Sequence, residues 1–324
     1  MTETRVPFQN VVDALLAPGK DFPKRYLSYF SDIDPASLAA LLEAWPRVKP
    51  ARKLSLLDKL KSLADEDTLV SFDDLSRALL ADPDAGVRAR AIRLLDECDD
   101  PKLVPAYIKI LSGDEDGAAR AEAANALGQF VMLGELEEIS EAVHHKAEDA
   151  LLASINNEKD VNVRRRALES LGFSSRPEVP ALIESAYQRQ SPEWQTSAMV
   201  AMGRSSDDRW EEQVISRLVN GDVRVQLAAV QAAGELGLPS ARPILLNMLT
   251  EEESDEIFAA AIWSLSQIGG EDARTYIEAL IAETEDDDLL DFLEDALENL
   301  AFTEDLERFD LLSFDPESIE DEEE

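Results

Sequence analysis

Apolar residues recur along the chain with the period of an α-helix, inside a unit that returns many times. The clearest copies read Asp84-x-x-Val87-Arg88-x-x-Ala91-Ile92-x-x-Leu95 and Asp160-x-x-Val163-Arg164-x-x-Ala167-Leu168-x-x-Leu171. Their apolar positions lie at i, i+4 and i+8, which places them on one face of a helix. Alignment on the central alanine yields eight copies, 31 to 44 residues apart, at Leu56, Ala91, Ala123, Ala167, Ala198, Ala229, Ala261 and Ala296. A small residue at this position allows two helices to approach closely.

Each of these helices is preceded by a second amphipathic segment, and prolines stand in the turn or the first helical turn, where a missing N–H is tolerated. The column four residues before the alanine is apolar in all seven later copies, so Trp194, which stands in it, is expected in the core. The unit is therefore a helix hairpin of about 31 to 35 residues. Such hairpins cannot bury their apolar faces alone, so we expect them to stack into a superhelix.

The units resemble HEAT repeats, particularly the short bacterial kind also called phycobilisome-lyase-like repeats. The resemblance rests on the Asp-x-x-Val-Arg-x-x-Ala pattern, the period, and a Leu-Gly ending in which Gly128, Gly172, Gly203 and Gly234 stand near the expected helix end. It implies an all-α fold, an α-solenoid superhelix of about eight stacked hairpins, whose second helices line a concave surface. It also implies a ladder of recurring Asp and Arg side chains between neighbouring repeats, although their i, i+4 spacing equally allows local pairs. The ladder residues are Asp84, Arg88, Asp116, Arg120, Asp160 and Arg164.

Three boundaries follow from where the repeats begin, lengthen and end. Residues 1–35 are predicted to form an N-terminal helical cap, and residues 36–301 the solenoid. The longest interval between copies indicates an insertion at about 131–144, expected as a longer surface connection, with a partner contact as the alternative. Residues 302–324 carry 11 acids and are predicted to be a disordered acidic tail. Because aromatic and leucine side chains are spaced among those acids, the tail is either solubilising or a docking peptide centred on Phe309, Leu312 and Phe314.

The charge balance limits the classes of partner that the chain is expected to bind. The chain has 31 Lys and Arg against 68 Asp and Glu, a net charge of −37, which disfavours nucleic acids and anionic membranes. One cysteine and the lack of a signal core or a membrane-spanning run predict a cytoplasmic protein. Residues 47–61 reverse the trend, with six bases and one acid. A basic start and an acidic end allow head-to-tail self-association or partner docking at the basic end, whereas an ordinary solvated helix face remains the simpler alternative.

Little in the sequence suggests catalysis. The two histidines, His144 and His145, are adjacent, and no nucleophile elbow, phosphate loop or Cys-x-x-Cys pair occurs. Deoxyhypusine hydroxylase resembles HEAT proteins and uses paired His-Glu dipeptides, but this chain contains no such dipeptide. Phycobilin lyases share the repeats, but repeats alone do not transfer activity. We therefore expect no enzyme activity, no cofactor, no metal and a surface histidine pair.

The resemblance points instead to the concave face as a binding surface. Positions one before and two after the alanine are expected there, and the candidate binding residues are Arg90, Arg93, Arg166, Glu169, Gln231 and Trp263. The interpretation is a non-enzymatic scaffold or adaptor that binds a protein or an extended peptide. The alternatives are an acidic mimic or chaperone for basic proteins and, on family association alone, a lyase-like or oxidoreductase-like enzyme.

Overall fold

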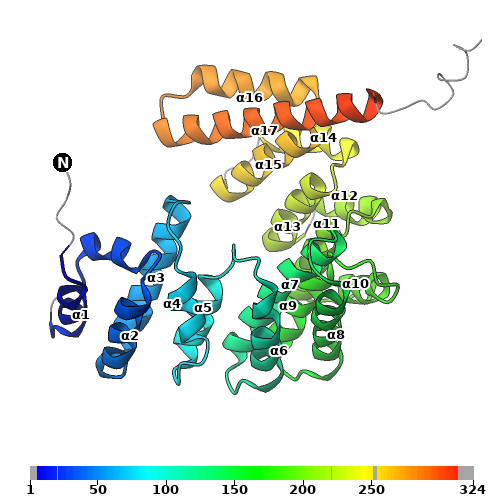
Figure 1. The fold of residues 1–324 in the computed structure, drawn as a ribbon. Helices are drawn as coiled ribbons and strands as arrows, with labels where there is room; N and C mark the ends of the chain where they lie inside the picture. The colour runs from blue at the N-terminus through cyan, green and yellow to red at the C-terminus, as the bar shows by residue number, and fades with distance from the viewer. Residues whose placement is uncertain (1–5, 20, 220, 251–253, 313–324) are drawn as a thin grey trace, which may run out of the picture. The chain divides into compact units, whose positions relative to one another are not determined.

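The computed structural model describes residues 6–19, 21–219, 221–250 and 254–312, with the side chains of 307–312 left out (Figure 1). The described residues are all-α, without a strand. The chain divides into two compact units, residues 1–174 and 175–324. Each unit is a stack of helix hairpins.

The first unit contains an N-terminal helix and four hairpins. Helix α1 (Phe8–Leu16) and a short 3₁₀ helix (Lys24–Phe30) come first. The hairpins are α2 (Pro35–Ala44) with α3 (Pro50–Glu66), α4 (Asp73–Leu79) with α5 (Ala85–Arg93), α6 (Val104–Gly113) with α7 (Gly117–Glu135), and α8 (Glu141–Asn157) with α9 (Val161–Leu171). The second helices pack in chain order, α3 on α5, α5 on α7 and α7 on α9.

The second unit repeats this arrangement with four more hairpins. They are α10 (Val179–Tyr187) with α11 (Pro192–Arg204), α12 (Glu211–Leu218) with α13 (Val223–Glu235), α14 (Arg242–Met248) with α15 (Asp255–Ile268), and α16 (Glu271–Glu283) with α17 (Asp287–Leu312). Helices α11, α13, α15 and α17 pack one on the next. The predicted all-α solenoid of stacked hairpins is therefore confirmed.

The aligned alanine column forms the centre of both stacks. Each of its eight members lies in the second helix of a hairpin, and each is at most 1% exposed. Trp194, four residues before one of these alanines, is 8% exposed, which confirms that it belongs to the core. A row of small residues at helix crossings keeps the helix axes close, so larger apolar residues on either side interdigitate.

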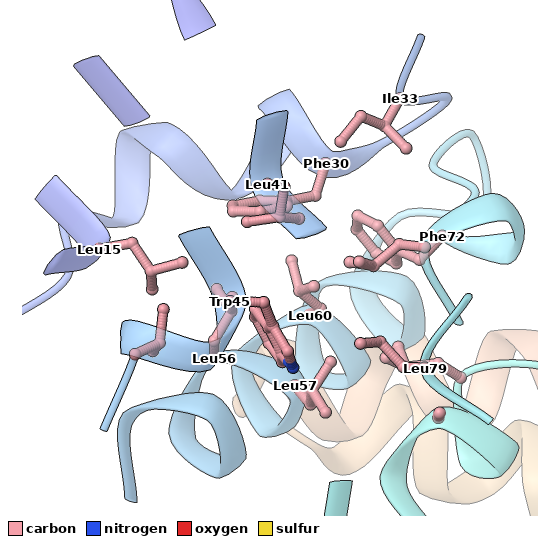
Figure 2. Close-up of a cluster of buried hydrophobic side chains, with 14 of the residues drawn as sticks. Leu15, Phe30, Ile33, Leu41, Trp45, Leu56, Leu57, Leu60, Phe72 and Leu79 are labelled. Atoms are coloured by element: carbon pink, nitrogen blue, oxygen red, sulfur yellow. The ribbon is translucent and has the colours of Figure 1, made fainter. Parts of the chain in front are cut away.

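At the N-terminus, α1 and the 3₁₀ helix pack on the first hairpin (Figure 2). Leu15 and Phe30 share one buried cluster with Leu41, Trp45 and Leu56. The first hairpin thus packs against helices that precede the repeats, and the cap over residues 1–35 stays a prediction.

The recurring glycines do not have the role that their place near helix ends suggested. Gly128, Gly203 and Gly234 lie inside helices, and Gly172 follows α9 with a φ of −51°, so none adopts the left-handed conformation of a C-terminal cap. Gly128, Gly203 and Gly234 allow close packing instead. A Cβ on Gly234 would lie 2.7 Å from the Cα of Ser264 on α15. A Cβ on Gly128 would lie 3.0 Å from the Cβ of Ser170 on α9.

The two predicted irregular segments are mostly helical. At 131–144 the extra residues lengthen α7 to Glu135 and start α8 at Glu141, so only residues 136–140 connect them. Residues 302–312, predicted as the start of a disordered tail, continue α17. They do so because Leu300 is fully buried and Arg274 donates to Glu304 at 2.6 Å, which ties this part of α17 to α16. Residues 313–324 lie outside the described part of the chain.

Substitution of Gly234 by alanine tests the close-packing role. We expect Gly234→Ala to lower the free energy of unfolding by about 1–3 kcal/mol, because α13 and α15 must separate, although alanine by itself favours a helix by about 1 kcal/mol. Gly113→Ala is the matched control, since its Cβ would meet nothing within 4 Å, and it should be neutral or stabilising. Denaturant unfolding followed by circular dichroism distinguishes the two. Equal effects from both substitutions would show that the close contact is not what requires Gly234.

Candidate functional site

The recurring aspartates begin helices and do not pair with the arginine of their own helix. Asp84 accepts the Gly86 N–H at 2.8 Å, Asp116 the Ala119 N–H at 2.9 Å and Asp160 the Asn162 N–H at 2.8 Å. Each aspartate thus satisfies an amide that the first turn leaves without a partner. One of the two expectations for these residues was a local i, i+4 ion pair. The aspartates cap their helices instead.

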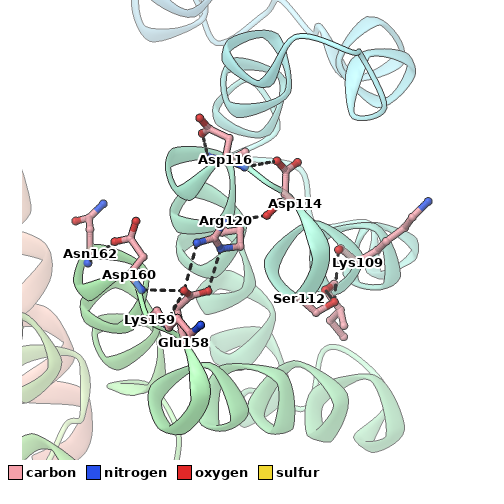
Figure 3. A network of polar contacts seen from close by, with 11 residues as sticks. Lys109, Ser112, Asp114, Asp116, Arg120, Glu158, Lys159, Asp160 and Asn162 are labelled. Carbon is pink, nitrogen blue, oxygen red and sulfur yellow. Dashed lines mark hydrogen bonds and ion pairs between the residues drawn. The ribbon is translucent and has the colours of Figure 1, made fainter.

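The arginines bind the next hairpin instead. Arg88 donates to both carboxylate oxygens of Asp114, with Nε–Oδ2 at 2.7 Å and Nη2–Oδ1 at 2.6 Å. Arg120 makes the same two-pronged contact with Glu158, at 2.9 and 3.2 Å (Figure 3). Both acids stand two residues before a capping aspartate and also accept its backbone N–H. The ladder therefore runs from an arginine to an acid that the sequence pattern did not single out.

The ladder begins one hairpin earlier and changes form at Arg164. Lys53, in the arginine position, contacts Asp82 at 3.4 Å, and Trp45 donates its indole N–H to the same carboxylate at 2.6 Å. Arg164 donates to the Ile155 carbonyl within its own hairpin. In the second unit Gln195 and Gln226 likewise donate to carbonyls at the end of the preceding helix. The neutral side chains there tie a hairpin to itself.

The arginines predicted to bind a partner are already paired within the chain. Arg90 contacts Asp58 at 2.6 Å, Arg93 contacts Glu122 at 2.5 Å, and Arg166 contacts Glu169 at 2.7 Å. The first two pairs join neighbouring hairpins, which means that the columns before and after the alanine neutralise one another. Glu169 is only 3% exposed. These contacts leave less charge for a partner than the sequence alone indicated.

The remaining predicted residues lie in the second unit. Gln231 is exposed on α13, and Trp263 is 41% exposed on α15. Phe302 and Leu306 on the adjacent α17 are also exposed, at 64% and 51%. Phe309 and Leu312 belong to α17 without described side chains, and Phe314 lies outside the described residues. Exposed apolar side chains are thus present on two neighbouring helices, α15 and α17, and the helical form of residues 302–312 was not expected because that segment was predicted to be disordered.

A basic pocket of about 340 Å³ opens at the N-terminal end of the first unit. Its basic lining consists of Arg47, Lys49, Arg52 and Lys59, with Asp21 as its one acid. Its apolar lining includes Leu15, Leu16, Phe22 and Leu56. Arg52 is held in place by donating to the carbonyls of Ala14, Leu15 and Ala17, at 3.1, 3.0 and 2.7 Å. The sequence showed the basic run but not the cap residues that turn it into a pocket.

The histidine pair differs from the surface pair that the sequence suggested. His144 is 9% exposed, because the end of the lengthened α7 packs over it, and a Cβ on Gly134 would collide with its ring. His145 stacks on it and remains exposed. Glu148, one turn further along α8, is 1% exposed. The structure therefore gathers a partly buried group of imidazoles and carboxylates, the side chains most suited among the described residues to hold a metal ion.

The helix hairpins and their inter-repeat contacts define an α-solenoid. The sequence matches the model of HEAT repeats over residues 72–145 and 211–298, together half of the chain. The chain belongs to the HEAT-repeat family. A search of curated proteins finds no match to the sequence. Among the described residues, no helix combines the length and the apolar character needed to cross a membrane.

Three solved structures illustrate its similarity to known proteins. YibA of Escherichia coli is 17% identical, with a TM-score of 0.41 over 78% of this chain and 98% of YibA. The Kap95:Nup1 complex is 14% identical, with a TM-score of 0.43 over 91% of this chain and 46% of the matched chain. Human deoxyhypusine hydroxylase in complex with glycerol is 14% identical, with a TM-score of 0.35 over 81% of this chain and 95% of the enzyme.

The Arg88–Asp114 contact yields a prediction about stability and pH. Burial by itself raises the pKa of Asp114, but the hydrogen bonds from Arg88 and from the Asp116 N–H outweigh it, so this pKa lies below the usual aspartate value. A carboxylate with a lowered pKa stabilises the fold above its unfolded pKa and loses that effect as pH falls through the folded one. We expect Arg88→Ala to lower the free energy of unfolding at pH 7 by about 2 kcal/mol, because Asp114 loses its partner. The difference should shrink as pH falls through the lowered pKa of Asp114, where the carboxylate takes up a proton.

Arg224→Ala is the control, because Arg224 pairs with Asp222 and Glu193 at an exposed position. It should leave stability at pH 7 unchanged. Urea unfolding of the three proteins at pH 7 and at successively lower pH provides the measurement. An Arg88→Ala deficit that stays equally large down to the most acidic pH at which the protein folds would contradict the role of the Asp114 charge.

Proposed function

We propose that this chain is a non-enzymatic HEAT scaffold that binds an acidic segment of a partner protein in the basic pocket of its first unit. The observation that carries the proposal is the pocket itself. Four basic side chains line it, although the whole chain has a net charge of −37. Cationic side chains concentrated in one concavity attract anionic groups and orient them.

Much of the basic charge in this pocket is available to a ligand. The neighbouring Lys53 and Lys61 are paired with Asp82, Asp65 and Asp96. Over the residues that the structure describes, Arg47, Lys49 and Lys59 form no ion pair with a carboxylate. Helix α3 begins at the pocket after Lys49, with no acid in its first turn, so the positive end of its dipole adds to the same potential.

The apolar walls of the pocket favour a ligand that has an apolar group as well as a negative charge. Leu16 and Phe22 lie among the pocket residues beside the basic side chains. A ligand with an apolar side chain between acidic residues would use both kinds of surface, whereas a small inorganic anion would use only one. The concave-face candidates Gln231 and Trp263 remain a second docking region, supported by the exposed apolar side chains on α15 and α17.

The alternative functions predict binding that depends differently on salt. An acidic chaperone or mimic would bind many basic proteins through its net charge, and that binding would collapse as salt rises. A pocket that also buries an apolar side chain loses only part of its affinity. The cytoplasmic location and the lack of nucleic-acid and membrane partners remain predictions from composition.

A peptide with the sequence of residues 302–324 is a suitable probe, because it combines acids with leucine and phenylalanine. We expect it to bind both the full chain and a chain that ends at residue 312, which lacks residues 313–324 of that segment. Arg47→Glu, Lys49→Glu and Lys59→Glu together should weaken binding about tenfold or more, because three attractive charges become repulsive. Fluorescence anisotropy at low and moderate salt measures the affinity.

Two control proteins make this test specific. Lys102→Glu, Lys109→Glu and Lys159→Glu together change the net charge equally at exposed sites outside the pocket, and should leave the affinity within about twofold. Trp263→Ala should also bind normally. If both charge-reversed proteins lost affinity equally, net charge alone would explain the binding. If only Trp263→Ala lost affinity, the peptide would bind in the second unit.

A further inference from the structure

Four side chains from two helices surround one small region at the end of α7 and the start of α8. His144, His145 and Glu148 of α8 each direct a potential ligand atom so that all three lie within 4.8 Å of one another. Glu135, the last residue of α7, brings its Oε1 to 3.7 Å from His144 Nε2. Glu148 Oε1 lies 3.5 Å from the same nitrogen.

The environment of His144 Nε2 is unusual for a nitrogen without a ligand. This atom is buried and has no hydrogen-bond partner. Hydrogen bonds from nitrogen to oxygen measure about 2.7–3.2 Å, so both carboxylates lie too far away to accept one. Ligand atoms held about 2.0–2.1 Å from a tetrahedral ion are separated by about 3.4 Å, close to the two distances from His144 Nε2 to the carboxylates of Glu135 and Glu148.

The surroundings hold these groups in place. Because Gly134 has no side chain, the His144 ring packs directly against the backbone of α7. Ser174 donates its hydroxyl to Glu148 Oε1 at 2.5 Å, which fixes the orientation of that carboxylate. Glu148 is 1% exposed, so its carboxylate lies inside the protein beside His144. Hydrogen bonds from outside the ligand set are typical of metal sites.

We propose that Glu135, His144, His145 and Glu148 bind one divalent metal ion of the zinc class. Two imidazole nitrogens and two carboxylate oxygens suit Zn²⁺, and Co²⁺ and Ni²⁺ as substitutes. The ion would tie the lengthened end of α7 to α8. Its role is structural, and it is independent of the peptide pocket.

Titration of the metal-free full chain with Co²⁺ tests the site, because tetrahedral cobalt with nitrogen and oxygen ligands absorbs strongly in the visible range. We expect such a spectrum, its loss on addition of Zn²⁺, and a higher melting temperature with Zn²⁺. Exchange of a ligand should weaken Co²⁺ binding at least tenfold. His145→Gln is the first variant, because His145 is exposed and its loss least endangers folding; Glu148→Gln is the second.

Glu138→Gln is the matched control, since it removes the same charge from the neighbouring α7–α8 connection without touching the four ligands. It should bind Co²⁺ as the unchanged protein does. The proposal is overturned if the folded protein shows no tetrahedral cobalt spectrum at millimolar Co²⁺. It is also overturned if His145→Gln binds with unchanged affinity, or if Glu138→Gln loses affinity as much as Glu148→Gln does. Those results would leave a polar cluster of His144 and the two carboxylates without a metal ion.

Discussion

The close approach of successive second helices is the contact on which the rest of the fold depends. It is made possible by a column of buried alanines and, one turn and a half further on, by glycines that face small residues of the next hairpin. Ser170 and Ser264 add a hydrogen bond to this contact, because each hydroxyl donates to a carbonyl of the preceding second helix, at 2.9 and 2.8 Å. Since each hairpin can bury its apolar face only against its neighbours, this spacing decides whether the stack forms.

The two units use different polar contacts around the same apolar design. In the first unit, arginines reach across to carboxylates of the next hairpin, and each of those carboxylates also holds the backbone that starts the next helix. In the second unit, glutamines hold a carbonyl of their own hairpin. A half-buried arginine–carboxylate contact couples neighbouring repeats and responds to pH, whereas an amide-to-carbonyl bond does neither. Charge also joins hairpins in the second unit, where Arg242 pairs with Asp272 at 2.9 Å, so the contrast between the units is confined to the arginine position of the repeat.

The sequence predicts the helices, the hairpins and the core well, because each depends on local periodicity and on one small residue per repeat. It predicts less of the polar structure. Asp114 and Glu158 lie outside the repeated motif, so their contacts with Arg88 and Arg120 follow only from how the hairpins stack. Gly234 resembles a helix terminator in sequence, and its role depends on Ser264, thirty residues later. The basic pocket likewise requires residues from the N-terminal helix and from α3 to meet, and the burial of His144 depends on how the end of α7 packs on α8, which no local pattern reveals.

The contacts between repeats determine which charged side chains are available to a partner. The arginines expected to bind a partner are neutralised between repeats, while the basic side chains beside the N-terminal helix remain available around a pocket with apolar walls. The most direct test is hydrogen–deuterium exchange of the full chain with and without the acidic 302–324 peptide. The account predicts slower exchange in residues 14–22 and 47–59 and no change in α15. Slower exchange confined to α15 and α17, or no change anywhere at saturating peptide, would contradict it.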